Sequence, residues 1–153
     1  MDNDTVIRLR RVVLKLARQL NAASREEGLT PTQASVLGIT TMRGPLSLAE
    51  LTEIEGINPT MLSRVIGKLD EHGLIKRLRD PGDFRAARVE VTPKGRGVYQ
   101  RITAQRSAVI SESVAVRQAA LLAALPALEN LAEDLRDTVR RVRDRLRVAP
   151  HPD

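Results

Sequence analysis

The sequence predicts a mainly α-helical (α+β) fold that contains one two-stranded hairpin. Apolar residues recur at intervals of three and four over most of the chain, as they do in amphipathic helices. Capping residues and glycines divide residues 30–73 into short helices, and residues 74–92 read as two strands around a turn. Two short helices that meet at a glycine and precede a basic hairpin are typical of a winged helix-turn-helix.

The composition limits the classes of protein and site. At 153 residues we expect a single domain over 1–153, with the winged helix-turn-helix in 30–100 and helical dimerisation regions in 4–27 and 101–147. The absence of cysteine excludes disulfides, thiolate zinc sites and thiol redox sensing, and a count of two histidines argues against a His-rich metal site, so we expect no cofactor or metal. No apolar run reaches the roughly 20 residues that span a bilayer, and the N-terminus is acidic where a signal peptide is basic. We therefore expect a cytoplasmic protein with no membrane partner.

The net charge of +6 is concentrated in one part of the chain. Residues 1–57 carry seven basic and seven acidic side chains, and residues 102–153 carry eight and seven. Residues 58–101 carry ten basic and five acidic side chains. A local excess of this kind favours a polyanionic partner such as DNA, although a solvated basic face that aids solubility is the alternative.

The N-terminal segment predicts an amphipathic helix. Asp4 is expected to cap it, and Gly28 to end it. Its apolar face is expected to comprise Val6, Leu9, Val13, Leu16 and Leu20.

Two capping boxes predict the next helices. Thr30 and Gln33 have the spacing of a capping box around Pro31, and this helix should close before Gly44. The same spacing recurs at Ser47 and Glu50, which open a short helix that ends at Gly56. Its inward residues are expected to be Leu48, Ala49 and Leu51.

The helix that follows Gly56 has a polar face suited to DNA. Asn58 and Pro59 supply its N-cap and first residue. Its apolar stripe consists of Leu62, Val65, Ile66 and Leu69. Its outer face carries Thr60, Ser63, Arg64, Gly67 and Lys68. Every surface helix needs a polar face, but hydroxyls and cations at the front of this one suit base edges and phosphates.

A basic hairpin comes next. Strands are expected at 74–79 and 88–92, with the turn Asp-Pro-Gly-Asp at 80–83 between them. Arg85 lies at or near the tip, where a guanidinium can enter a narrow minor groove. Asp83 either orients that guanidinium through an ion pair or serves only as a turn residue.

The C-terminal segment predicts helix-to-helix packing. A helix should start at Pro93, and a later segment repeats apolar residues in alternating steps of four and three: Leu121, Leu125, Leu128, Ala132, Leu135, Val139, Val142 and Leu146. So regular a repeat favours dimerisation over packing within one chain. Pro126 either begins the last helix or kinks it. The arginines of its final turns either complement the helix dipole or contact DNA.

Two stretches resemble the MarR family of bacterial transcription regulators: DEHGLIKR at 70–77 and DPGDFRAARVEVTPKG at 80–95. The resemblance extends over about residues 4–147. It implies an obligate homodimer, with intertwined N- and C-terminal helices, on a pseudo-palindromic operator in double-stranded DNA. It places recognition on Pro59, Thr60, Ser63, Arg64 and Lys68, and minor-groove contact on Arg85. The family commonly has a basic residue where this chain has Phe84.

The resemblance also implies a repressor that is released by a small, often phenolic, anionic effector. The effector would lie between the dimer helices and the DNA-binding region, and candidates by location are Arg8, Met42 and Arg43. Arg8 can equally be a solvated helix residue, and Met42 a core residue. Further basic residues expected on the DNA-binding surface are Lys76, Arg77, Arg79 and Arg88. Dimerisation is assigned to Val6, Leu9, Leu128, Leu135, Val139, Val142 and Leu146.

Two other functions are weighed against DNA binding. A winged helix used only as a protein-interaction or assembly module tends to lose basic residues from these surfaces, which this chain keeps. An enzyme needs a nucleophile with a base, a metal site or paired carboxylates. His72 is the one internal candidate base, and it lies at a helix end, so no enzyme activity is expected.

Overall fold

A computed structural model describes residues 1–79, 82 and 87–148, without the side chains of residues 143 and 146–148. The chain divides into two compact units, Met1–Val109 and Ile110–Asp153. The division falls within helix α6 (Pro93–Val114), so the first unit holds the sheet and the helices that precede α6.

The first helix starts earlier than predicted. Helix α1 spans Asn3–Leu20, and the Asp2 carboxylate caps it by accepting the N–H of Thr5 at 2.7 Å. The predicted cap at Asp4 is therefore wrong, because Asp4 already lies in the first turn, where its charge suits the helix dipole. The helix ends at Leu20 rather than at Gly28, and a short helix α2 (Ala22–Glu26) follows at once.

The next three helices begin at the predicted caps. Helix α3 (Pro31–Arg43) and helix α4 (Leu48–Glu55) each start with a complete capping box, in which side chain and backbone bond reciprocally. Helix α5 (Pro59–Glu71) starts where Asn58 Oδ1 accepts the N–H of Met61 at 2.8 Å. Between α4 and α5, Gly56 adopts a left-handed conformation with φ of 71°, as the tight turn requires.

The inward face of α4 differs from the prediction at one position. Leu51 is fully buried and Leu48 half-buried, but Ala49 is exposed. Ala49 lies in the first turn, about 100° round the helix from Leu48, and its side chain is exposed to solvent, so the prediction for it is wrong.

The hairpin belongs to a three-stranded antiparallel sheet. Its strands are β1 (Leu46–Ser47), β2 (Ile75–Arg79) and β3 (Ala87–Val91), in the order β1-β3-β2. Leu46 pairs with Val89. The two predicted strands are confirmed, but β1 was missed because two residues before a helix cap carry no alternating pattern.

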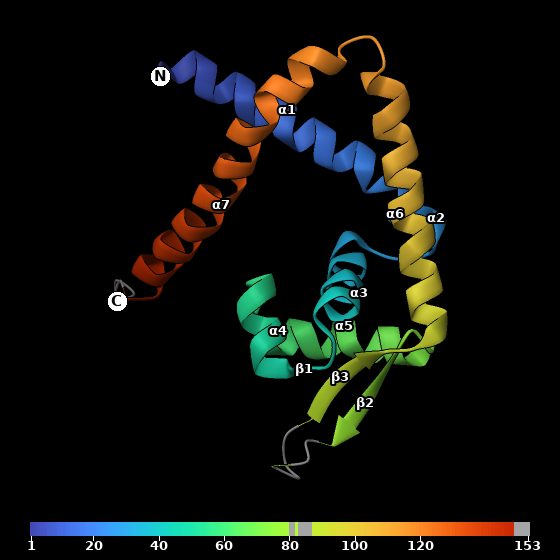
Figure 1. Ribbon diagram of the computed structural model, residues 1–153. Helices are drawn as coiled ribbons and strands as arrows, with labels where there is room; N and C mark the ends of the chain where they lie inside the picture. Colours follow the sequence, from blue (N-terminus) through green and yellow to red (C-terminus); the bar gives the residue numbers. More distant parts are fainter. Residues whose placement is uncertain (80–81, 83–86, 149–153) are drawn as a thin grey trace. The chain divides into compact units, whose positions relative to one another are not determined.

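The core of the first unit is aliphatic and fixes α5 in place. Helix α5 packs against α3, α4 and β2 (Figure 1). The predicted stripe of α5 is confirmed, since all four of its residues are buried. The largest fully buried apolar side chains of the core are Leu37, Leu51, Leu62, Ile66, Leu69, Ile75, Ile102, Val36 and Val89.

The start of α6 (Pro93–Val114) is locked onto the end of α5. Thr92 Oγ1 donates a hydrogen bond to the Gly73 carbonyl at 2.7 Å, and Lys94 Nζ donates to the His72 carbonyl at 2.8 Å. A Cβ added at Gly95 would lie 1.9 Å from the Leu74 carbonyl oxygen. Only glycine allows this approach, so the direction of α6 is set by the backbone that follows α5.

The second unit is dominated by the long helix α7 (Gln118–Val148). Pro126 lies inside α7, so the alternative in which it begins the last helix is wrong. Among the described residues, none of the helices combines the length and the apolar character needed to cross a membrane.

Candidate nucleic-acid interface

The outer face of α5 is exposed and polar. Thr60, Ser63, Arg64 and Lys68 are all exposed, and Gly67 is half-buried. The opposite face is anchored in the core, so these side chains are presented on a rigid helix. Short polar and cationic side chains on such a helix are the groups that hydrogen-bond base edges and phosphates in the major groove.

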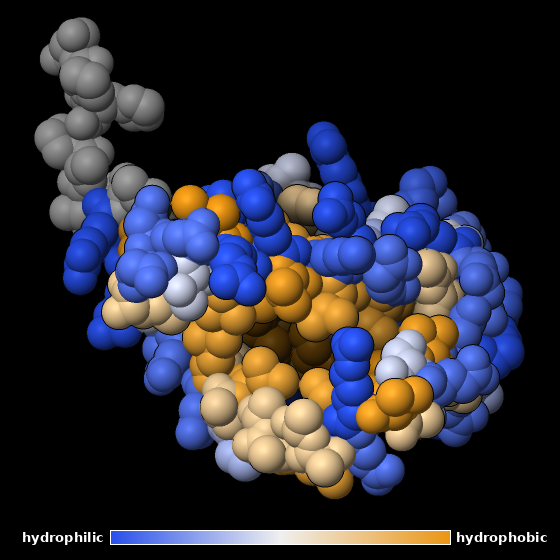
Figure 2. Space-filling model, turned by 90° about the horizontal axis from the view of Figure 1, so that it is seen from above, coloured by the Kyte–Doolittle hydropathy of each residue, from blue (hydrophilic) through white to orange (hydrophobic). Residues whose placement is uncertain are grey.

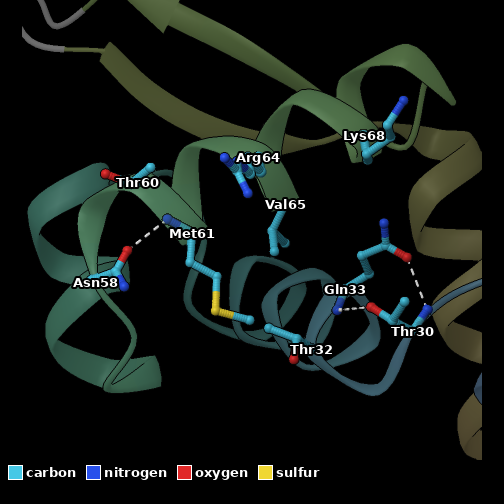
Figure 3. Close-up of a pocket in the computed structure, with 9 residues that line it drawn as sticks. All are labelled: Thr30, Thr32, Gln33, Asn58, Thr60, Met61, Arg64, Val65 and Lys68. Carbon is cyan, nitrogen blue, oxygen red and sulfur yellow. Dashed lines mark hydrogen bonds between the residues drawn. The ribbon is translucent and has the colours of Figure 1, made fainter.

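One flank of α5 borders a groove of about 700 Å³. Figure 3 shows Met61 and Val65 pointing from α5 toward the first turn of α3, with Thr32 on the other side. The lining residues are Thr30, Thr32, Gln33, Asn58, Thr60, Met61, Arg64, Val65 and Lys68. The groove therefore joins three predicted DNA contacts, Thr60, Arg64 and Lys68, to the start of α3, for which no DNA-binding role was predicted.

The basic side chains of this surface differ in their partners within the protein. The Arg64 guanidinium has no intramolecular partner within the described part of the chain. Lys68 Nζ lies 2.7 Å from Glu71 Oε2, and its hydrogen bond lowers the pKa of the Glu71 carboxyl. Both side chains are more than half exposed, so this ion pair contributes little to folding and can exchange for another anion.

The strands carry further basic residues. Arg77 Nε lies 3.9 Å from Asp70 Oδ2, and Lys76 Nζ lies 2.8 Å from Glu90 Oε2. Arg88 is half-buried, and its guanidinium donates to the Pro45 carbonyl at 3.3 Å. Arg88 thus helps to hold β1 beside β3, a structural contact that the sequence did not predict.

The tip of the hairpin carries two predicted DNA contacts that lie outside the described residues. These are Asp83 and Arg85, together with Phe84 between them. Their roles stay predictions that rest on the sequence.

The three effector candidates are exposed. Arg8 lies on α1, and Met42 and Arg43 lie at the end of α3. The Met42 side chain is 70% exposed, and its sulfur accepts a hydrogen bond from the Tyr99 hydroxyl at 3.8 Å. The interpretation of Met42 as a core residue is therefore wrong, while an effector role for the three residues stays a prediction.

The residues assigned to dimerisation leave apolar surface uncovered in the single chain. Helix α1 has no buried residue. The exposed fraction is 45% for Val6, 47% for Leu135 and 61% for Val139, and hydrophobic residues are widely exposed in the view of Figure 2. Leu128 and Val142 are also exposed, Leu9 is half-buried, and the side chain of Leu146 is outside the described part.

Sequence reasoning missed the groove residues Met61, Thr32 and Gln33. A signal for Met61 was present, because Met61, Arg64 and Lys68 follow one another at steps of three and four on one side of α5. No local signal marked Thr32, since its place beside α5 follows from the packing of α3 on α5.

Comparison with known proteins identifies the family. Residues 29–87 match the family model described as "MarR family". The chain is 23% identical over 109 residues to the HTH-type transcriptional repressor MdtR of Bacillus subtilis, covering 71% of this chain and 70% of that protein. It is 32% identical over 79 residues to the uncharacterized HTH-type transcriptional regulator YkoM of B. subtilis, covering 52% and 51%. Residues 29–87 are thus a MarR-family region. This match and the matched relatives support a DNA-binding transcription regulator and not an enzyme.

Solved structures confirm the winged-helix fold of the chain. RV1404 from Mycobacterium tuberculosis matches with a TM-score of 0.71 and 26% identity, covering 85% of this chain and 90% of that one. A mutant MarR from E. coli, complexed with operator DNA, matches with a TM-score of 0.56 and 24% identity, covering 67% and 76%. NadR in complex with 4-hydroxyphenylacetate matches with a TM-score of 0.65 and 22% identity, covering 88% and 91%.

Proposed function

We propose that the chain is a cytoplasmic, homodimeric repressor that binds a pseudo-palindromic operator through α5. The observation that carries this proposal is the exposed outer face of α5, whose Arg64 guanidinium has no partner within the described residues. An arginine that is paired within the protein must lose that partner before it binds DNA. Arg64 has no such partner within the described residues, so its guanidinium can donate two N–H groups to the edge of a guanine. The operator complex of E. coli MarR supports the same use of this fold.

The apolar surface of α1 and α7 supports a dimer. Monomeric proteins seldom leave many large apolar side chains exposed along whole helices, and here α1 buries none of its residues. A second copy of the chain would bury this apolar surface most simply, because a two-fold dimer uses the same surface on both subunits. It would also supply two copies of α5, as a palindromic operator requires.

Release by a small aromatic acid is the regulatory part of the proposal. NadR with 4-hydroxyphenylacetate shows that a protein of this fold takes such a ligand. Arg8 and Arg43 are exposed cations that could pair with a carboxylate, and Met42 offers a thioether that adapts to an aromatic ring. These three residues are proposed contacts.

Selection of bound sequences from a random DNA pool tests the proposal. We expect an enriched palindrome with half-sites one helical turn apart, and Arg64→Ala should weaken its binding by about 1–3 kcal/mol. The matched control is Arg25→Ala, which removes the same charge from an exposed position of α2 and should bind as wild type does. Failure to enrich any sequence, or equal losses in both variants, would contradict specific binding through α5.

A further inference from the structure

We propose that one strand of the DNA backbone lies in the groove between α5 and α3, where Lys68 and Thr32 contact its phosphates. This inference rests on the proposed DNA binding through α5 and assigns different roles to two neighbouring parts of the exposed face of that helix. It adds Thr32 to the interface and removes Lys68 from the residues that read bases.

The geometry of α5 separates base contacts from backbone contacts. With 3.6 residues per turn, Thr60 and Arg64 lie nearly opposite the buried stripe, whereas Met61 and Lys68 lie roughly a quarter-turn further toward α3; all four line the groove. An α-helix nearly fills the major groove, so a phosphate strand runs along each of its flanks. Arg64 therefore points toward base edges, and Lys68 points toward a strand.

The chemistry of the groove fits a sugar-phosphate strand. Its lining includes two cations and three threonine hydroxyls, and none of the nine lining residues is acidic. Met61 and Val65 supply apolar surface between the polar edges, as the faces of deoxyribose rings require (Figure 3). The charge of the groove is thus complementary to a polyanion along its length.

The Thr32 hydroxyl is free to bind a phosphate within the described part of the chain, whereas the side chains of Thr30 and Gln33 are already hydrogen-bonded. Thr30 and Gln33 satisfy one another through the capping box, at 2.8 and 3.2 Å. The Thr32 hydroxyl is half-buried at the groove and has no hydrogen bond within the described part of the chain. Lys68 is paired with Glu71, which does not line the groove, so a phosphate can replace that carboxylate without a change in the fold.

Lys68→Ala and Arg64→Ala distinguish the two kinds of contact. Removal of a phosphate contact should weaken binding to all sequences alike and reduce the slope of log affinity against log salt by about 1. We expect this result for Lys68→Ala. Arg64→Ala should instead relax the preference at one base pair of the enriched site. A changed base preference in Lys68→Ala, with an unchanged salt slope, would overturn the assignment.

Thr32→Glu tests the α3 side of the groove. A carboxylate in the first turn of a helix suits its dipole, so the variant should unfold at or above the wild-type temperature. The same charge would face the phosphate strand, and we expect affinity for the enriched site to fall roughly tenfold or more. The control, Ser107→Glu, adds one negative charge at an exposed position of α6 outside the groove and should bind nearly as wild type does.

The outcomes separate this inference from the proposed function. If wild-type protein enriches no sequence, the proposed function fails. If wild type binds and Thr32→Glu binds equally well, DNA binding stands and the backbone does not occupy the groove. If Thr32→Glu keeps DNA binding but loses its response to an added aromatic acid such as 4-hydroxyphenylacetate, the groove holds an effector and the inference is overturned.

Discussion

Replacement of Gly95 by alanine should destabilise the protein through a single backbone contact. The added Cβ would lie 1.9 Å from the Leu74 carbonyl oxygen and 2.8 Å from its carbonyl carbon. No side-chain rotation relieves this overlap, because the contacted atoms are backbone and the Leu74 carbonyl also accepts the N–H of Thr92 at 3.0 Å. Overpacking costs about 1–3 kcal/mol, and we expect the upper end of that range here.

The gain in helix propensity offsets part of that cost. Alanine is better than glycine in a helix by roughly 1 kcal/mol, which leaves a net loss of about 2 kcal/mol. For a chain of this size, such a loss lowers the unfolding temperature by roughly 4–8 °C. Thermal unfolding followed by circular dichroism measures the change.

Gly67→Ala is the matched control for Gly95→Ala. Gly67 lies inside α5, and a Cβ added there meets no atom within 4 Å, so this variant should be as stable as wild type or slightly more stable. If Gly95→Ala unfolds at or above the wild-type temperature, α6 is not held against Leu74 as described.

Two further predictions follow from burial and exposure. Burial raises the pKa of the Glu55 carboxyl, and the hydrogen bond from Ser35 at 2.8 Å only partly offsets this. Because the folded state binds this proton more tightly than the unfolded state, Glu55 lowers stability increasingly as pH rises through its folded pKa. Glu55→Gln should therefore unfold at a higher temperature than wild type at neutral pH, with the difference vanishing below the ordinary glutamate pKa; an unchanged difference at acidic pH would contradict this. Leu135→Asp should keep helicity but weaken dimerisation by about 100-fold or more, since two leucines at about 1.5–3 kcal/mol each would lose their burial. Sedimentation velocity measures this, with Asn130→Asp on the same helix as the control, and a stable Leu135→Asp dimer would exclude this face.

Local features of the fold could be predicted residue by residue. The caps at Thr30, Ser47 and Asn58 were found because each depends on side chains within three positions of the helix start. Strand β1 was missed because its two residues owe their conformation to pairing with β3, far along the chain. Local pattern determines the first kind of feature, and tertiary packing determines the second.

The candidate DNA-binding surface was likewise predicted only where it depends on local sequence. Arg64 and Lys68 followed from the polar face of α5, which a helical projection of the sequence reveals. The groove with Thr32 did not follow, because it exists only where α3 packs on α5. The contact of Arg88 with Pro45 also depends on residues distant in sequence, so its structural role was not apparent from charge alone.

The spacing of the bound half-sites tests whether two copies of α5 bind the operator together. Footprinting of wild-type protein on the enriched sequence, with the mass of the complex measured in parallel, gives both the spacing and the number of chains. Two chains on half-sites about 10 base pairs apart are predicted, because two α5 helices on one face of DNA must enter successive major grooves. One chain on a single site, or protection that does not depend on sequence, would contradict the account.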